Sequence, residues 1–102
     1  MTPTAFSQEL IEVSAPGSPR LSDPNALSAV VVAAAGAVGM SAHGPPIVRE
    51  GPGGIAVGLL CRDGHIVVHA MPKEGLCLID IVARLPADVS KGVDVITRRL
   101  AP

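Results

Sequence analysis

The stretch that decides the fold runs from Asp63 to Arg84 and reads DGHIVVHAMPKEGLCLIDIVAR. Two apolar runs within it, His65–Met71 and Leu76–Arg84, are rich in β-branched residues and predict two strands. The segment between them, 72–75, combines a proline, two charged residues and a glycine, which is typical of a turn. We therefore expect an antiparallel hairpin at the centre of the fold.

A third apolar run, Ile55–Arg62, precedes this hairpin and predicts another strand. The dipeptide Asp63-Gly64 joins them, and such a dipeptide favours a two-residue hairpin turn. The two turns together predict four cross-strand neighbours: Arg62 with His65, Gly58 with His69, His69 with Leu78, and Val67 with Asp80.

The remaining elements complete an α+β pattern, an antiparallel sheet with two helices packed on one face. Asp23 is expected to cap the first helix, with Pro24 in its first turn. In chain order we expect a strand over Ser7–Ser14, a loop over Ala15–Ser22, a helix from Pro24 to about Ser41, an edge strand over Ile47–Glu50, a loop over Gly51–Gly54, and, after the three central strands, a helix capped by Asp88 and ending near Leu100. We expect one domain over residues 1–102.

Alternation along the central strands assigns their side chains to two faces of the sheet. The first face is wholly apolar and should lie under the helices: Leu59, Cys61, Ile66, Val68, Ala70, Cys77, Ile79, Ile81 and Ala83. The second face, called the open face from here on, mixes apolar and charged residues: Leu60, Arg62, His65, Val67, His69, Met71, Leu78, Asp80, Val82 and Arg84. No helix remains to cover it, so we expect a second copy of the chain to pack there as a homodimer.

Composition narrows the function classes. Of the 102 residues 48% are hydrophobic, but Phe6 is the one aromatic residue, and a small aliphatic core favours oligomerisation. The net charge of −1 and the scattered basic residues argue against nucleic-acid binding. Cys61 and Cys77 form no CxxC motif, so we expect buried thiols in a cytoplasmic protein. The apolar segment 26–42 is shorter than the roughly 20 residues of a spanning helix, and we expect a buried helix and no membrane association.

The stretch 63–84 also resembles the signature of the bacterial S-adenosylmethionine decarboxylases. That signature reads roughly E-S-H-x-x-x-H-T-W-P-E-x-G, followed by an apolar strand ending in D-x-x-T-C-G. The matching positions are His65, His69, Pro72, Gly75 and Asp80. The resemblance implies an α/β sandwich that pairs into dimers with active sites near the interface. It also implies decarboxylation by a pyruvoyl group that the chain makes by cutting its own backbone.

Gly64 departs from the family at the decisive position, because it stands where the family has the serine that becomes the pyruvoyl group. A glycine has no hydroxyl to attack the preceding carbonyl, so we expect no pyruvoyl cofactor. His69 corresponds to the histidine that helps processing. The other departures are Asp63 for a glutamate, Ala56 for an assisting serine, Met71 for a tryptophan and Arg84 for a proton-donating cysteine. We therefore assign no catalytic residue among the family-equivalent positions Asp63, Gly64, His69 and Arg84.

Four residues of the open face are candidates for ligand binding: Arg62, His65, His69 and Asp80. Alternate strand residues are ~7 Å apart, so the two histidines lie ~13 Å apart and should not share a metal ion. A pair between His69 and Asp80 fits better, as a structural hydrogen bond or as a means to orient the imidazole. The two arginines of this face, Arg62 and Arg84, leave two readings open, an anionic ligand or salt bridges across a dimer.

Three hypotheses about function follow. The first is an unprocessed member of this family that acts as a binding or regulatory homodimer. The alternative is an active decarboxylase of polyamine biosynthesis, acting on S-adenosylmethionine or a basic amino acid. The third is a structural domain in which the local match is misleading.

Overall fold

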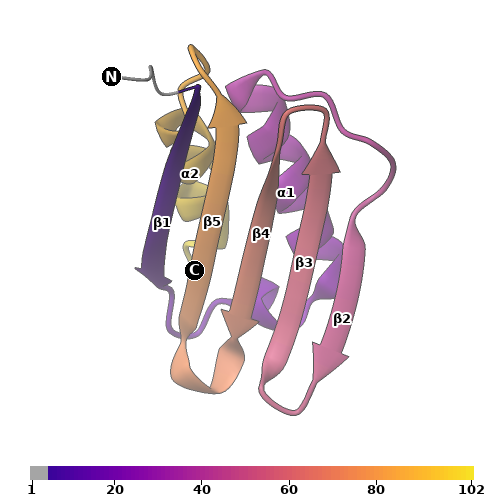
Figure 1. The fold of residues 1–102 in the computed structure, drawn as a ribbon. Helices are drawn as coiled ribbons and strands as arrows, with labels where there is room; N and C mark the ends of the chain where they lie inside the picture. Colours follow the sequence, from indigo (N-terminus) through magenta and orange to yellow (C-terminus); the bar gives the residue numbers. More distant parts are fainter. Residues whose placement is uncertain (1–4) are drawn as a thin grey trace.

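Five antiparallel strands form one sheet in the order β1-β5-β4-β3-β2, with both helices behind it in the view of Figure 1. The computed structural model describes residues 5–102. The strands are β1 (Phe6–Ser14), β2 (Ile47–Gly51), β3 (Gly54–Cys61), β4 (Gly64–Met71) and β5 (Leu76–Arg84). Short 3₁₀ turns, η1 (Pro19–Ser22) and η2 (Pro72–Glu74), lie before the first helix and between β4 and β5. The predicted α+β architecture, with two helices on one face of an antiparallel sheet, is confirmed.

Helix α1 (Pro24–Val38) begins where the sequence predicts, because the Asp23 carboxylate accepts hydrogen bonds from the backbone N–H groups of Asn25 and Ala26 at 3.0 and 3.2 Å. The predicted end near Ser41 is wrong. Gly39 adopts a left-handed φ of 89°, and its N–H and that of Met40 both donate to the Ala35 carbonyl at 2.9 Å. This is the usual glycine stop of a helix.

The chain after α1 is bonded to the sheet before β2 starts. The N–H of His43 donates to the carbonyl of Leu60 at 2.8 Å, and the N–H of Arg62 donates to the carbonyl of Ser41 at 2.9 Å. The end of β3 is therefore paired on both of its edges, and the residues after α1 lie beside the β3–β4 turn.

Helix α2 (Ser90–Leu100) closes the chain over β1 and β5. Its predicted capping residue, Asp88, lies two residues before the helix, and the Asp88 carboxylate accepts from the N–H and the hydroxyl of Ser90 at 3.0 and 2.6 Å. These hydrogen bonds hold the pKa of Asp88 below its ordinary value. Gly92 lets α2 pack closely, since a Cβ there would lie 2.9 Å from side-chain atoms of Ile81 and Val38.

The hydrophobic core lies between the helices and the apolar face of the sheet. All nine residues predicted for that face are buried, from Leu59 in β3 to Ala83 in β5. The helices contribute nine more: α1 supplies Leu27, Val30, Val31, Ala34, Ala35 and Val38, and α2 supplies Val93, Ile96 and Leu100. The start of β3 and the connecting segments complete the core with Ala15, Leu21, Ile55, Val57 and Val89. In the part of the chain that the structure describes, no helix is long and apolar enough to cross a membrane.

The β3–β4 turn differs from the prediction by one residue. Cys61 pairs with Gly64, so Arg62 and Asp63 form the turn and Gly64 is the first residue of β4. The predicted neighbours of the two histidines across this turn are therefore wrong: His65 lies opposite Leu60 and His69 opposite Ala56. Because the register moves by two residues, each side chain of the paired strands keeps its predicted face, whereas Arg62 moves from the open face into the turn. The predicted pairs across the next turn, His69 with Leu78 and Val67 with Asp80, are confirmed.

The open face carries several exposed apolar side chains, and residues 5–102 place no helix over it. Leu10 is 60% exposed, Leu60 55% and Ile47 47%. Edge strands β1 and β2 thus add apolar area on either side of the central strands.

The cap of α1 provides a test of how the first helix is anchored. We expect Asp23→Ala to lower the free energy of unfolding by about 1 kcal/mol, because two N–H groups lose their acceptor. Urea denaturation followed by circular dichroism measures this. Ala29→Gln, at an exposed position inside the same helix, is the matched control and should change stability by less than about 0.5 kcal/mol. Equal effects of the two substitutions would contradict the cap.

Candidate functional site

The family-equivalent positions fall into two groups at opposite ends of β4. Asp63, Gly64 and Arg84 lie at the β3–β4 turn, whereas His69 lies five residues along β4, opposite Ala56. At ~3.3 Å per residue this separates Gly64 from His69 by roughly 16 Å along the strand. Alternation also places them on different faces of the sheet. Within one copy of the chain, His69 therefore lies too far away to act on the peptide bond before Gly64.

Gly64 lies against the backbone of the neighbouring strand. A Cβ built at this position would lie 2.0 Å from the carbonyl oxygen of Val82 and 3.2 Å from the Cα of Ala83. Both are backbone atoms, so no rotation of a side chain relieves the overlap. The space that a serine side chain needs is occupied by β5.

Arg84 makes only surface contacts at the end of β5. Its Nε lies 3.8 Å from Oδ1 of Asp63, and both side chains are about half exposed, at 53% and 51%, so the pair contributes little stability. Its guanidinium also lies 4.9 Å from the centre of the Phe6 ring, which is within the range of a cation–π contact. An arginine stays protonated in proteins, so Arg84 is not a proton donor.

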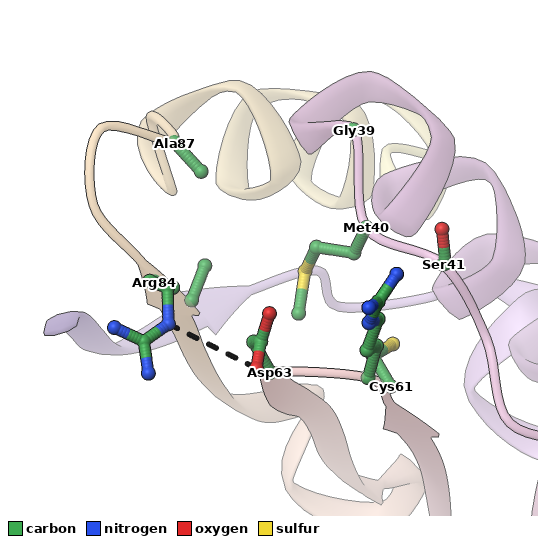
Figure 2. Close-up of a pocket in the computed structure, with 9 residues that line it drawn as sticks. Gly39, Met40, Ser41, Cys61, Asp63, Arg84 and Ala87 are labelled. Carbon is green, nitrogen blue, oxygen red and sulfur yellow. Dashed lines mark ion pairs between the residues drawn. The ribbon is translucent and has the colours of Figure 1, made fainter.

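A cavity of about 140 Å³ opens between the end of α1 and the β3–β4 turn. Figure 2 shows Met40 pointing from the end of α1 towards this turn, with Asp63 and Arg84 at the opposite side and Ala87 above. The predicted ligand candidate Arg62 also lines the cavity, as a turn residue and not as a strand residue of the open face. The cavity thus combines an apolar interior with a charged rim.

His65 and Asp80 form the polar centre of the open face. Nε2 of His65 lies 3.4 Å from Oδ2 of Asp80, and Nε2 of Gln8 donates a hydrogen bond to Oδ1 of the same carboxylate at 2.8 Å. The predicted pairing of Asp80 with His69 is wrong, because His69 lies opposite Leu78 while Asp80 lies diagonally across from His65. A carboxylate held from two sides fixes the orientation of the imidazole.

His69 is exposed at the other end of β4. It lines a shallow groove of about 460 Å³ with Arg49 and Met71, next to the turn between β2 and β3. The predicted loop over Gly51–Gly54 is shorter than expected, since β2 ends at Gly51 and β3 begins at Gly54. Among the described residues, no group of three His, Cys, Asp or Glu side chains is placed to hold a metal ion.

Sequence reasoning missed two contributors to these sites. Gln8 was not foreseen because its contact with Asp80 depends on β1 pairing with β5, and nothing in the pattern of Ser7–Ser14 specifies its neighbour. Met40 was assigned to the first helix, although Gly39 is a signal that the helix stops there.

Comparison with known proteins gives matches both to a family and to solved structures. A sequence model of a family described as S-adenosylmethionine decarboxylase matches residues 7–102. The crystal structure of the adenosylmethionine decarboxylase from Aquifex aeolicus VF5 superposes with a TM-score of 0.84 at 15% identity, over 97% of this chain and 82% of that chain. At this identity the likeness shows a shared fold. Comparison with curated proteins gives no match.

Both cysteines are buried, as predicted, and their reactivity provides a test of the core. Burial raises the pKa of Cys77 from 9.0 to about 11 and also raises the pKa of Cys61. At pH 8 we expect Cys77 to react with a disulfide reagent at least about a hundredfold more slowly in the folded than in the unfolded protein, because only the thiolate reacts. The variants Cys77→Ser and Cys61→Ser show which modification rate belongs to which cysteine. Fast modification of Cys77 in the folded protein would contradict its burial.

The raised pKa of Cys77 also predicts that the stability of the fold depends on pH. Between pH 9 and about 11 the unfolded state loses the Cys77 proton that the folded state retains, so the free energy of unfolding should fall as the pH rises through this window. Urea titrations at pH 8, 9 and 10 measure the effect. The slope should be smaller in Cys77→Ser than in the unmodified protein.

Proposed function

The chain belongs to the S-adenosylmethionine decarboxylase family, and from this we propose that it is an unprocessed member without pyruvoyl-dependent activity that acts as a binding or regulatory homodimer. A single observation carries the proposal. Gly64 offers no hydroxyl, and the carbonyl of Val82 occupies the place where its side chain would begin.

The residues present do not fit the pyruvoyl group that the family implies. The group would have to arise from residue 64, which has no side-chain atoms to supply it and no room to hold them. Arg84 adds a permanent charge at the position of the family's proton donor. This chain therefore lacks both the nucleophile and the proton donor that the family's reaction uses.

The open face supports the homodimer. Leu10, Leu60 and Ile47 are each roughly half exposed, and together with the central strands they form an apolar surface around the His65–Asp80 pair. A small domain with such a face gains stability when a second copy removes it from water. Its two unpaired cysteines accord with a cytoplasmic setting.

Two places support a ligand-binding role. The cavity beside the β3–β4 turn has an apolar interior and a rim of Arg62, Asp63 and Arg84, which suits a small molecule with both apolar and charged parts. The oriented imidazole of His65 on the open face offers a ring nitrogen for a hydrogen bond to a partner or ligand.

Intact-mass measurement tests whether the chain cuts itself. We expect one species of about 10.3 kDa after purification and after prolonged incubation, because no hydroxyl is present to start the cleavage. Two fragments with the break between Asp63 and Gly64 would contradict the proposal. Carbon-dioxide release from S-adenosylmethionine, ornithine and arginine should stay at background, and robust turnover would favour the alternative, an active decarboxylase.

Substitutions at Gly64 test whether the space beside it is closed. We expect Gly64→Ala and Gly64→Ser each to lower the free energy of unfolding by about 1–3 kcal/mol, since both add a Cβ that overlaps the Val82 carbonyl. Gly64→Ser should remain uncut. Gly36→Ala is the matched control: its Cβ meets nothing within 4 Å on an exposed helix position, so it should leave stability unchanged or raise it by up to about 1 kcal/mol. Efficient backbone cleavage of the Gly64→Ser variant would show that this fold still supports self-cleavage.

A further inference from the structure

The two edges of the sheet differ in how they are protected against a further strand. At one edge, β2 has five residues, with Pro46 directly before it and Pro52 directly after it. A proline lacks the N–H that a neighbouring strand would need, and short edge strands flanked by prolines resist the addition of another strand. The β2 edge is therefore closed to a partner.

At the other edge, β1 has none of these protections. It is nine residues long and pairs with β5 at every position from Phe6 to Ser14, without a bulge. It contains no proline and no basic residue, which are the residues that most often block an exposed edge. Figure 1 shows β1 as the outermost strand, with α2 behind the sheet rather than beside it.

The outer backbone groups of β1 are available for hydrogen bonding. In an antiparallel pair every second residue directs its N–H and C=O towards the neighbouring strand, and the others direct theirs away from it. Within residues 5–102, no backbone hydrogen bond other than the ladder with β5 reaches residues 6–14. About half of the nine residues thus hold a donor and an acceptor that a further strand can use.

The charge of β1 indicates what kind of strand fits beside it. Its two charged residues, Glu9 and Glu12, are both acidic, and they lie on opposite faces of the sheet because they are three residues apart. Among the described residues, neither glutamate has an ion-pair partner within 4.0 Å. A neighbouring strand with a basic residue opposite each glutamate would form one cross-strand ion pair on each face.

We propose that β1 docks an extended, basic segment of a partner protein, which adds to the sheet as a sixth strand. The main chain of the segment bonds to the outer N–H and C=O groups of β1. Lying antiparallel to β1, the segment places two lysines or arginines, three residues apart, opposite Glu12 and Glu9. On the helix side its apolar residues lie beside Ile11 and Val13, which are half-buried against the core.

A second copy of this chain is a poorer occupant of the same edge. Two β1 strands side by side would bring together four glutamates and no basic residue. Like charges on neighbouring strands destabilise their pairing. A basic segment from another protein replaces this repulsion with attraction.

This inference rests on the binding role proposed above and names the class of its partner, but it depends on neither the homodimer nor the absence of cleavage. The synthetic peptide TVKVTKTVT is the probe, because its two lysines fall opposite Glu12 and Glu9 when it lies antiparallel to β1. Amide hydrogen exchange followed by NMR resolves the two sets of N–H groups in β1. The set bonded to β5 should be protected in the free protein, whereas the outer set should gain at least about tenfold protection with saturating peptide.

Three controls separate strand addition from general attraction. The same peptide with N-methyl groups along its docking edge cannot form the backbone hydrogen bonds, so it should give no protection. The peptide TVEVTETVT, with glutamates in place of lysines, should bind at least about fivefold more weakly than the basic peptide. The double variant Glu9→Gln, Glu12→Gln should lose most of this preference, whereas Glu50→Gln on β2 should keep it.

The outcomes that would overturn the proposal are distinct. They are an outer set that stays unprotected at millimolar basic peptide, an N-methylated peptide that binds equally well, and equal affinities for the basic and acidic peptides. Protection of the outer set without any peptide would show that a second copy already covers the edge, and it would also overturn the proposal. None of these results changes the intact-mass or carbon-dioxide measurements, so failure of the docking edge is distinguishable from failure of the proposed function.

Discussion

The register of β4 between its two neighbours is the constraint on which the rest of the structure depends. The turn at Arg62-Asp63 sets β4 against β3, and the turn at η2 sets it against β5. With both fixed, every second side chain of the three strands faces the helices and the others face the opposite way. The apolar core and the pattern of the open face are thus two results of one alignment.

That alignment also determines what the family-equivalent residues can do. It places Gly64 beside the turn, with the Val82 carbonyl oxygen where a side chain would begin. It places His69 at the other end of β4, opposite Leu78. On the open side, Asp80 and His65 instead form a carboxylate–imidazole pair. The fold of the family therefore persists, while the family-equivalent positions are divided between the two ends of β4.

Much of this fold could be predicted from local pattern. Alternation in β3, β4 and β5 gave the correct faces. The Asp23-Pro24 cap gave the correct start of α1, and Asp88 gave that of α2 to within one residue, because these signals depend on neighbouring residues alone. The turn was misplaced because Asp63-Gly64 favours a hairpin turn in isolation, while in the fold Gly64 pairs with Cys61.

The candidate site was less predictable because it depends on contacts between strands that are distant in sequence. The His65–Asp80–Gln8 cluster requires the strand order, which alternation does not specify. The family resemblance singled out positions along the chain, but their distribution over two ends of β4 and two faces of the sheet depends on the strand pairing. Spacing in a sequence fixes distances along one strand only.

The close approach of β4 to β5 also limits which substitutions this position accepts. A serine at position 64 is a change of one residue, but its side chain would meet backbone atoms of β5 before it could take part in any chemistry. Self-cleavage would therefore need two changes at once, a hydroxyl at position 64 and a shift of the neighbouring strand.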